Sequence, residues 1–306
     1  MSVSRKIYMD HTAGKPIDPR VIEAMLPYME FFYGNPFSIH SFGEEPRKAL
    51  DEARIKIAEL INAERKESII FASGATESNN LAIKGVANRN ADRGKHIITS
   101  SIEHMSVLNP CKFLKTKGFN VTFLPVDSYG IISLESLEHE LKDDTILVSV
   151  QYANGEIGTI QPIKEISQIV HRKNAYLHVD ATAANGQIQI DVRKDGIDLL
   201  TLSSNEMYGP KGVGALYIRE GVRLEPIFHG GGQERGLRSG TENVPGIVGF
   251  GKAAEIAKNE MQEESERLSR LRDKLIKGLL ESVPYSFLNG HPTMRLPDTP
   301  QYGSAS

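Results

Sequence analysis

Short runs of β-branched and apolar residues alternate with amphipathic stretches along most of the chain. The predicted strands cover residues 68–72, 96–100, 121–125, 145–151, 176–180, 197–203 and 213–218. Several of them are apolar at successive positions, as is typical of strands that helices cover on both faces. Strands that alternate with helices in this way favour an α/β fold with a mostly parallel sheet.

Three amphipathic stretches predict long helices, at residues 19–32, 44–61 and 251–280. The first has Asp18 as its predicted N-cap and Pro19 at the first helical position, where the missing N–H of proline costs nothing. The last has leucines on one stripe at spacings of three and four: Leu268, Leu271, Leu275 and Leu279. Beyond it, one strand-like piece at 285–288 is predicted and then no periodic element.

The composition is that of a globular protein. Of the 306 residues 40% are hydrophobic and 25% charged, which argues against global disorder. A net charge of -3 gives no basic surface for nucleic acid or anionic lipid, so small molecules and proteins are the expected partners. One cysteine cannot form an internal disulfide or a cysteine metal cluster. With no predicted signal peptide and no run of the ~18 apolar residues that a membrane helix needs, we expect a cytoplasmic protein without a metal site.

Two segments at predicted strand ends contain candidate binding residues. Residues 73–80, SGATESNN, lead from a strand into a helix, and the free amides of such a helix start suit a phosphate. An ordinary turn with a serine cap explains the segment equally well. Asp180 ends an apolar strand at the edge where open α/β sheets bind ligands, and it could hold a proton on a heteroaromatic nitrogen or cap a helix.

Three further features complete the candidate chemistry. His104 follows another strand end and could stack on a flat ring, although a lone histidine is more often part of the core. Residues 203–214 are glycine-rich and join two strands. Residues 229–243 are too polar and too rich in glycine for a core segment, which is typical of a functional loop.

Taken together, these motifs resemble those of the cysteine desulfurases of the NifS and IscS type, in the class V aminotransferase family. The resemblance rests on residues 33–40, 73–80, 103–104, 156–159, 178–181, 208–212 and 230–243. It implies a pyridoxal phosphate (PLP) protein of fold type I, with a seven-stranded, mainly parallel sheet between helices and a small α+β domain. It also implies removal of sulfur from cysteine for iron-sulfur cluster assembly, in contact with a scaffold protein.

The resemblance assigns the cofactor contacts to particular residues. It implies that Ala75, Thr76 and Ser203 bind the phosphate of PLP. It implies that His104 stacks on the ring and that Asp180 faces the pyridine nitrogen. The family forms homodimers, in which Thr241 is implied to reach the phosphate of the neighbouring subunit.

The chain departs from the family pattern where the chemistry takes place. The family holds PLP as an imine on a lysine that a histidine precedes, and here Glu206 and Asn205 occupy those two positions. A carboxylate cannot form an imine, and it adds a second acid near Asp180, which raises the pKa of one of the two. Gly155 and Ala183 replace an asparagine and a glutamine that contact the ring in the family.

Two further parts of the family mechanism lie beyond the end of this sequence. They are the nucleophilic cysteine and the arginine that binds the substrate carboxylate. Cys111 lies in a helical stretch, 109–114, and is predicted to be an ordinary buried thiol, and Lys211 is predicted to be structural. The expected organisation is a large domain at 15–250 and a truncated small domain at 1–14 and 251–306.

Three hypotheses about function follow. The chain is a desulfurase-like protein linked to sulfur delivery, catalytically impaired because no catalytic residue is intact at the lysine and histidine positions. Alternatively, it is a non-catalytic scaffold or partner-binding subunit in iron-sulfur assembly. As a third possibility, it is the product of an interrupted desulfurase gene. Truncation is expected to leave strand edges and apolar surface exposed.

Overall fold

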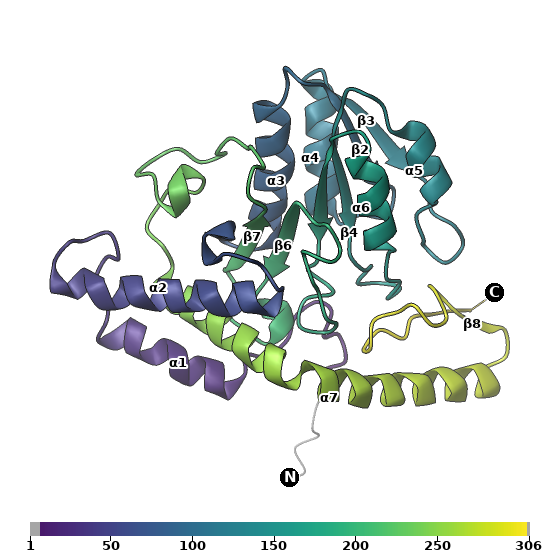
Figure 1. Ribbon diagram of the computed structural model, residues 1–306. Helices are drawn as coiled ribbons and strands as arrows, with labels where there is room; N and C mark the ends of the chain where they lie inside the picture. Colours follow the sequence, from purple (N-terminus) through teal and green to yellow (C-terminus); the bar gives the residue numbers. More distant parts are fainter. Residues whose placement is uncertain (1–6, 305–306) are drawn as a thin grey trace, which may run out of the picture.

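A seven-stranded sheet forms the centre of the computed structural model, which describes residues 7–304 (Figure 1). The strands are β1 (Ile69–Ala72), β2 (His96–Ser100), β3 (Asn120–Leu124), β4 (Thr145–Gln151), β5 (Tyr176–Asp180), β6 (Leu199–Ser203) and β7 (Gly214–Ile218). Their order is β1-β7-β6-β5-β4-β2-β3, and β7 alone is antiparallel to its neighbours. The predicted α/β class and mainly parallel sheet are confirmed.

Helices cover both faces of the sheet. On one side lie α3 (Ala75–Arg89) and α4 (Met105–Thr116), and on the other α5 (Leu134–Glu140) and α6 (Ile163–His171). Successive side chains of β1 point to opposite faces of the sheet. Ile70 packs in the core beneath α3 and α4, whereas Ile69 and Phe71 pack in the core on the other face. That second core continues into α1 (Pro19–Glu30), α2 (Ser41–Leu60) and α7 (Val244–Ser282).

Most predicted element boundaries agree with the structure to within a few residues. Asp18 caps α1 as predicted, since its carboxylate accepts a 2.8 Å hydrogen bond from the Arg20 amide. The sixth strand begins at Leu199 instead of residue 197, because the turn at Gly196, with φ of 65°, holds Ile197 in a hydrogen bond to Val192. Residue 68 belongs to a short 3₁₀ turn, η1 (Lys66–Ser68), that precedes β1.

The start of α7 is the largest difference at a helix. It begins at Val244 instead of residue 251, with the Asn243 side chain accepting a hydrogen bond from the Gly246 amide. Two glycines in this first part allow close helix packing. A Cβ added to Gly251 would lie 2.6 Å from Cα of Ala53 on α2, and one added to Gly249 would lie 2.7 Å from the sulfur of Met25 on α1. Small residues at a helix crossing give little hydrophobic periodicity, which explains why the pattern did not predict this part.

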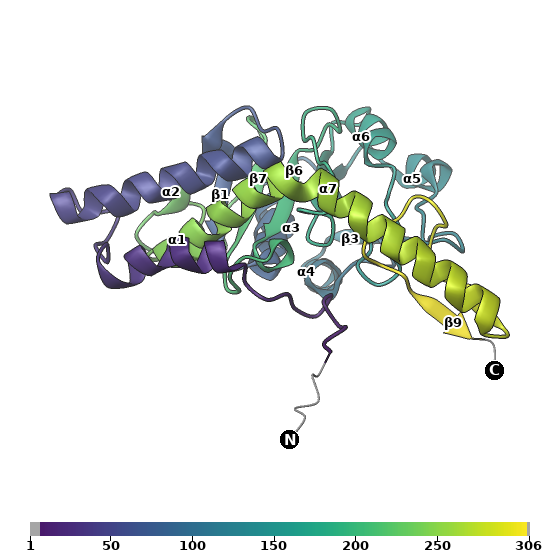
Figure 2. The same cartoon turned by 90° about the horizontal axis from the view of Figure 1, so that it is seen from below.

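The second half of α7 extends past the sheet, as the view from below shows (Figure 2). After α7 the chain forms two short antiparallel strands, β8 (Ser286–Leu288) and β9 (Tyr302–Ser304). β9 was not predicted because its residues show no alternation of polar and apolar positions. Half of the predicted leucine stripe is exposed, with Leu271 53% and Leu275 44% exposed, whereas Leu268 and Leu279 are partly buried.

The division into a large and a small domain stays a prediction. Helix α7 runs without a break through the predicted boundary at residues 250 and 251. Within that predicted small domain, residues 1–6 and 305–306 lie outside the described part of the chain. None of the described helices is both long enough and apolar enough to cross a membrane.

Candidate active site

A cavity of about 440 Å³ opens at the carboxyl ends of β4 and β5, the edge where open α/β sheets bind ligands. Four of the residues singled out from the sequence line it together: Ala75, His104, Asp180 and Glu206. These residues come from four separate segments of the chain. The fold therefore brings into one cavity candidate residues that the sequence predicted from separate motifs. Its volume is within the range of small-molecule sites.

Asp180 is held in place from two sides. Its carboxylate accepts hydrogen bonds from Asn79 Nδ2 at 2.7 Å and from the amide and hydroxyl of Thr182 at 3.0 and 2.5 Å. The bonds from Thr182 close a local turn, and because residues 181–198, between β5 and β6, contain no helix, the alternative of a helix cap is wrong. The Asn79 bond crosses from α3. His178 lies two residues before Asp180 on the same strand, and burial lowers its pKa to about 4. This histidine is therefore neutral at pH 7 and provides no positive charge to the Asp180 carboxylate.

His104 stands at the rim of the cavity and is exposed, which excludes the alternative of a core histidine. It is the N-cap of α4, where its Nδ1 accepts a 3.1 Å hydrogen bond from the Ser106 amide. A ring fixed by this cap is suited to lie against a flat ligand.

Glu103 is a cavity residue to which the sequence assigned no role of its own. It is 5% exposed, its Oε1 accepts a hydrogen bond from Ser100, and its Oε2 has no partner among residues 7–304. Nε2 of Gln151, in the same wall, is likewise buried without a partner there. Burial raises the pKa of Glu103 to about 8, so the group is mostly protonated at neutral pH.

The start of α3 is the place where the sequence predicts a phosphate. Gly74 is the N-cap, with φ of 149°, and no side chain caps the helix, so the predicted alternative of a serine cap is wrong. A Cβ added to Gly214 would lie 2.8 Å from the Gly74 backbone, so β7 must have glycine there for this loop to keep its position. Ala75 lines the main cavity, and Thr76 lines an adjoining hollow that also contains His104.

Ser203 and Glu206 lie on one short segment after β6. The Ser203 hydroxyl donates to Asn205 Oδ1 at 2.5 Å, and Asn205 Nδ2 donates to Glu206 Oε1 at 2.9 Å. Burial raises the pKa of Glu206, while the positive charge of Lys15 opposes that shift. The Lys15 side chain is 5% exposed, and its Nζ donates to the main-chain oxygen of Glu206 at 3.1 Å and lies 3.6 Å from Asp298.

Gly155 and Ala183, which stand where the family has an asparagine and a glutamine, face each other in the cavity wall. A Cβ added to Gly155 would lie 3.5 Å from Cβ of Ala183, so both leave space where a ring contact was expected. Thr241 is exposed and does not line this cavity within one chain.

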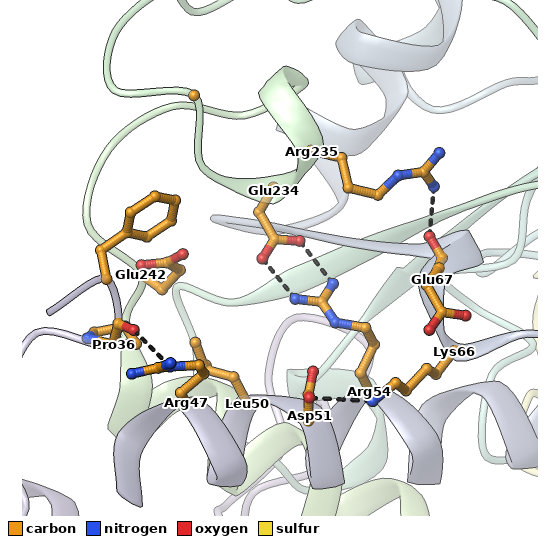
Figure 3. A pocket seen from close by; sticks show the side chains of 12 residues that line it. Pro36, Arg47, Leu50, Asp51, Arg54, Lys66, Glu67, Glu234, Arg235 and Glu242 are labelled. Atoms are coloured by element: carbon orange, nitrogen blue, oxygen red, sulfur yellow. Dashed lines mark hydrogen bonds and ion pairs between the residues drawn. The ribbon is translucent and has the colours of Figure 1, made fainter. Parts of the chain in front are cut away.

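Thr241 lies on the loop 229–243, which is anchored beside a second cavity of about 550 Å³ (Figure 3). Glu234 of this loop is buried and accepts two hydrogen bonds from Arg54 on α2, at 2.7 and 2.8 Å. The loop therefore has a fixed attachment next to the segment that contains Thr241.

Cys111 and Lys211, the other two residues considered from the sequence, lie outside the main cavity. Cys111 is fully buried, as predicted, and burial raises its pKa to about 12, which leaves it without thiolate character at neutral pH. Lys211 is exposed and does not line the main cavity. Across residues 7–304 no cluster of three His, Cys, Asp or Glu side chains could hold a metal ion.

Comparisons with known proteins agree with this geometry. Residues 7–299 match the model of the family described as aminotransferase class-V. A cysteine desulfurase, IscS 1 of Archaeoglobus fulgidus, is 62% identical over 95% of this chain and 75% of its own length. A solved NifS-like protein superposes with a TM-score of 0.94 at 43% identity, covering 97% of this chain and 81% of that one. A structure titled SspA in complex with cysteine gives a TM-score of 0.79 at 42% identity over 82% of this chain and 72% of that one.

Proposed function

Because the chain belongs to the class V aminotransferase family and, within it, to the cysteine desulfurases of the IscS and NifS type, we propose that it is a catalytically impaired desulfurase. In this proposal it binds the family cofactor, PLP, without a covalent link and takes part in sulfur delivery for iron-sulfur assembly. The observation that carries it is the Glu206 carboxylate in the cavity wall, together with the absence of any lysine among the residues that line this cavity.

The residues present fit the cofactor. The uncapped start of α3 suits the phosphate, His104 can stack on the ring, and Asp180 can hold a proton on the pyridine nitrogen. When bound, PLP supplies an electron sink for bond cleavage at an amino acid. Asn79 and Thr182 hold the Asp180 carboxylate in advance, so binding does not have to orient it.

What the chain lacks is an amine within this cavity. Schiff-base chemistry requires a nucleophilic nitrogen, and a carboxylate at Glu206 cannot provide one. Lys15 lines the neighbouring cavity, where its ammonium group is occupied by the main-chain oxygen of Glu206 and by Asp298. Cleavage of the carbon-sulfur bond of cysteine therefore has neither a covalent anchor nor a proton shuttle at the usual place.

Exposed apolar side chains support a role in assembly with other chains. Phe31 is 69% and Ile39 99% exposed around the α1–α2 connection, and we propose that a second copy covers this surface in a homodimer. In that dimer Thr241 would reach the cavity of the partner. A second candidate function, a non-catalytic scaffold that binds an iron-sulfur assembly protein, is favoured by the uncovered Leu271 and by Phe287, which is 48% exposed.

The proposal is tested by placing a lysine at position 206, so that the cavity contains an amine. Glu206→Lys combined with Asn205→His should develop a visible absorption band when PLP is added, whereas the wild type and the matched control Glu206→Gln with Asn205→His should not. Sulfide release from cysteine is measured in parallel, and we expect none from the wild type. Sulfide release by the wild type at the rate of the lysine variant would overturn the impairment. A lysine variant without the band would contradict the view that Glu206 is the main block to a covalent link.

A further inference from the structure

The cavity wall contains acids without a countercharge inside the cavity. Asp180 and Glu206 line its interior, next to Glu103, whose raised pKa leaves it mostly protonated. Glu156 stands at the solvent-exposed rim, and no lysine or arginine lines the cavity. The buried, unpartnered Oε2 of Glu103 and Nε2 of Gln151 lie in the same wall, so the cavity offers polar atoms that need a ligand to satisfy them. Such a lining favours a ligand that carries a positive group and hydrogen-bonding atoms.

Of the two ionisable acids inside the cavity, Asp180 accepts three hydrogen bonds and Glu206 has fewer partners. Glu206 accepts one hydrogen bond, from Asn205, and among residues 7–304 it forms no ion pair within 4.0 Å. The nearby Lys15 binds the main-chain oxygen of Glu206 instead and pairs with Asp298. A half-satisfied, mostly buried carboxylate gains most from a cationic hydrogen-bond donor.

Resting on the proposed function, we propose that this cavity prefers the amine form of the vitamin B6 phosphates, pyridoxamine 5′-phosphate, because Glu206 pairs with its ammonium group. The aldehyde, amine and alcohol forms share the ring nitrogen and the phosphate. They differ in the group on ring carbon 4, opposite the nitrogen. With the nitrogen at Asp180 and the phosphate at the start of α3, we expect this group to meet the segment after β6 that contains Glu206.

The physical basis of the preference is the chemistry of the group at carbon 4. The aldehyde offers an acceptor, which an ionised carboxylate repels, and the alcohol offers one neutral donor. The ammonium group offers a charge-assisted hydrogen bond, which is about twice as strong as a neutral one. Burial raises the pKa of Glu206, and a cation beside it would reverse that shift and keep the carboxylate ionised.

The test compares three ligands that differ in one group. Dissociation constants of the purified full chain are measured by calorimetric titration with pyridoxamine, pyridoxine and pyridoxal 5′-phosphates, at one pH and one salt concentration. Because the aldehyde can react with surface lysines, the decisive ratio is that of amine to alcohol. We expect the amine form to bind the wild type about tenfold more tightly or better. Glu206→Gln should reduce the ratio to within about twofold.

Glu156→Gln is the matched control, because Glu156 is an exposed acid at the rim of the same cavity and its loss should leave the ratio unchanged. Equal binding of the three ligands would overturn this inference while leaving the proposed cofactor site intact. A preference that survives in Glu206→Gln would also overturn it. No binding of any of the three would overturn both the inference and the proposed function.

Discussion

Removing the Glu234 carboxylate should destabilise the protein more than a change at any surface acid, because three hydrogen-bond donors from two groups depend on it. It accepts hydrogen bonds from both terminal nitrogens of Arg54 and, at 2.7 Å, from the Phe71 amide of β1. The side chains of Arg54 and Glu234 are 13% and 2% exposed. This ion pair joins α2 and the sheet to the loop 229–243 (Figure 3).

The expected magnitude follows from this geometry. Glu234→Ala leaves a mostly buried guanidinium without its counterion and a strand amide without an acceptor, and breaking a buried pair on one side costs roughly 3–5 kcal/mol. Replacing both partners by apolar residues, Arg54→Met with Glu234→Leu, should lose less than the single change, because no unpaired charge remains buried. If the double variant is more stable than Glu234→Ala, the main cost is that of an unpaired buried charge, and if it is less stable, the main cost is lost packing.

Urea unfolding followed by circular dichroism measures these free energies. Glu67→Ala is the control, since Glu67 is a half-exposed acid 3.8 Å from Arg65 and its removal should cost below about 1 kcal/mol. If Glu234→Ala lost no more than this control, the bidentate pair would not be the attachment of the loop. If the double variant were the less stable one, the argument from an unpaired charge would be wrong.

Two further predictions concern buried titratable groups. The pKa of Glu103 is raised to about 8 from 4.5, so the folded protein keeps a proton that the unfolded chain loses, and stability should fall as the pH rises from about 4.5 to about 8. Glu103→Gln should flatten that slope in unfolding experiments, and an unchanged slope would contradict the assignment. Cys111 should resist a thiol reagent in the native protein and react fully in denaturant, and rapid native labelling would contradict its burial.

The elements that could be predicted are those whose pattern is local. β4 is buried along its whole length and β5 from its second residue on, and both were predicted with the bounds that the structure shows. A mostly apolar run of this length marks a strand between helices. The first part of α7 was not predicted, since Gly249 and Gly251 allow contacts with α1 and α2 that the sequence does not show. β9 depends on pairing with β8, which is a tertiary contact without a local pattern.

The same distinction applies to the site. His104 and Asp180 were predicted from their places at strand ends, and the structure brings them into one cavity. Lys15 could not be found in this way, because its main partner is Glu206, 191 positions further along the chain. The role of Glu103 depends on the unpartnered oxygen and the complete burial of its carboxyl group, which the sequence does not show.

Lys15 also bears on how Glu206 is tolerated at this position. A carboxylate that is mostly buried without a nearby cation is costly, and the ammonium group of Lys15 lowers that cost by opposing the rise in the pKa of Glu206. In Glu206→Lys the same ammonium would face a like charge. Repulsion between them favours the neutral, nucleophilic form of the new amine, which is the form that reacts with an aldehyde. The neighbour that stabilises the acid would therefore also activate its replacement.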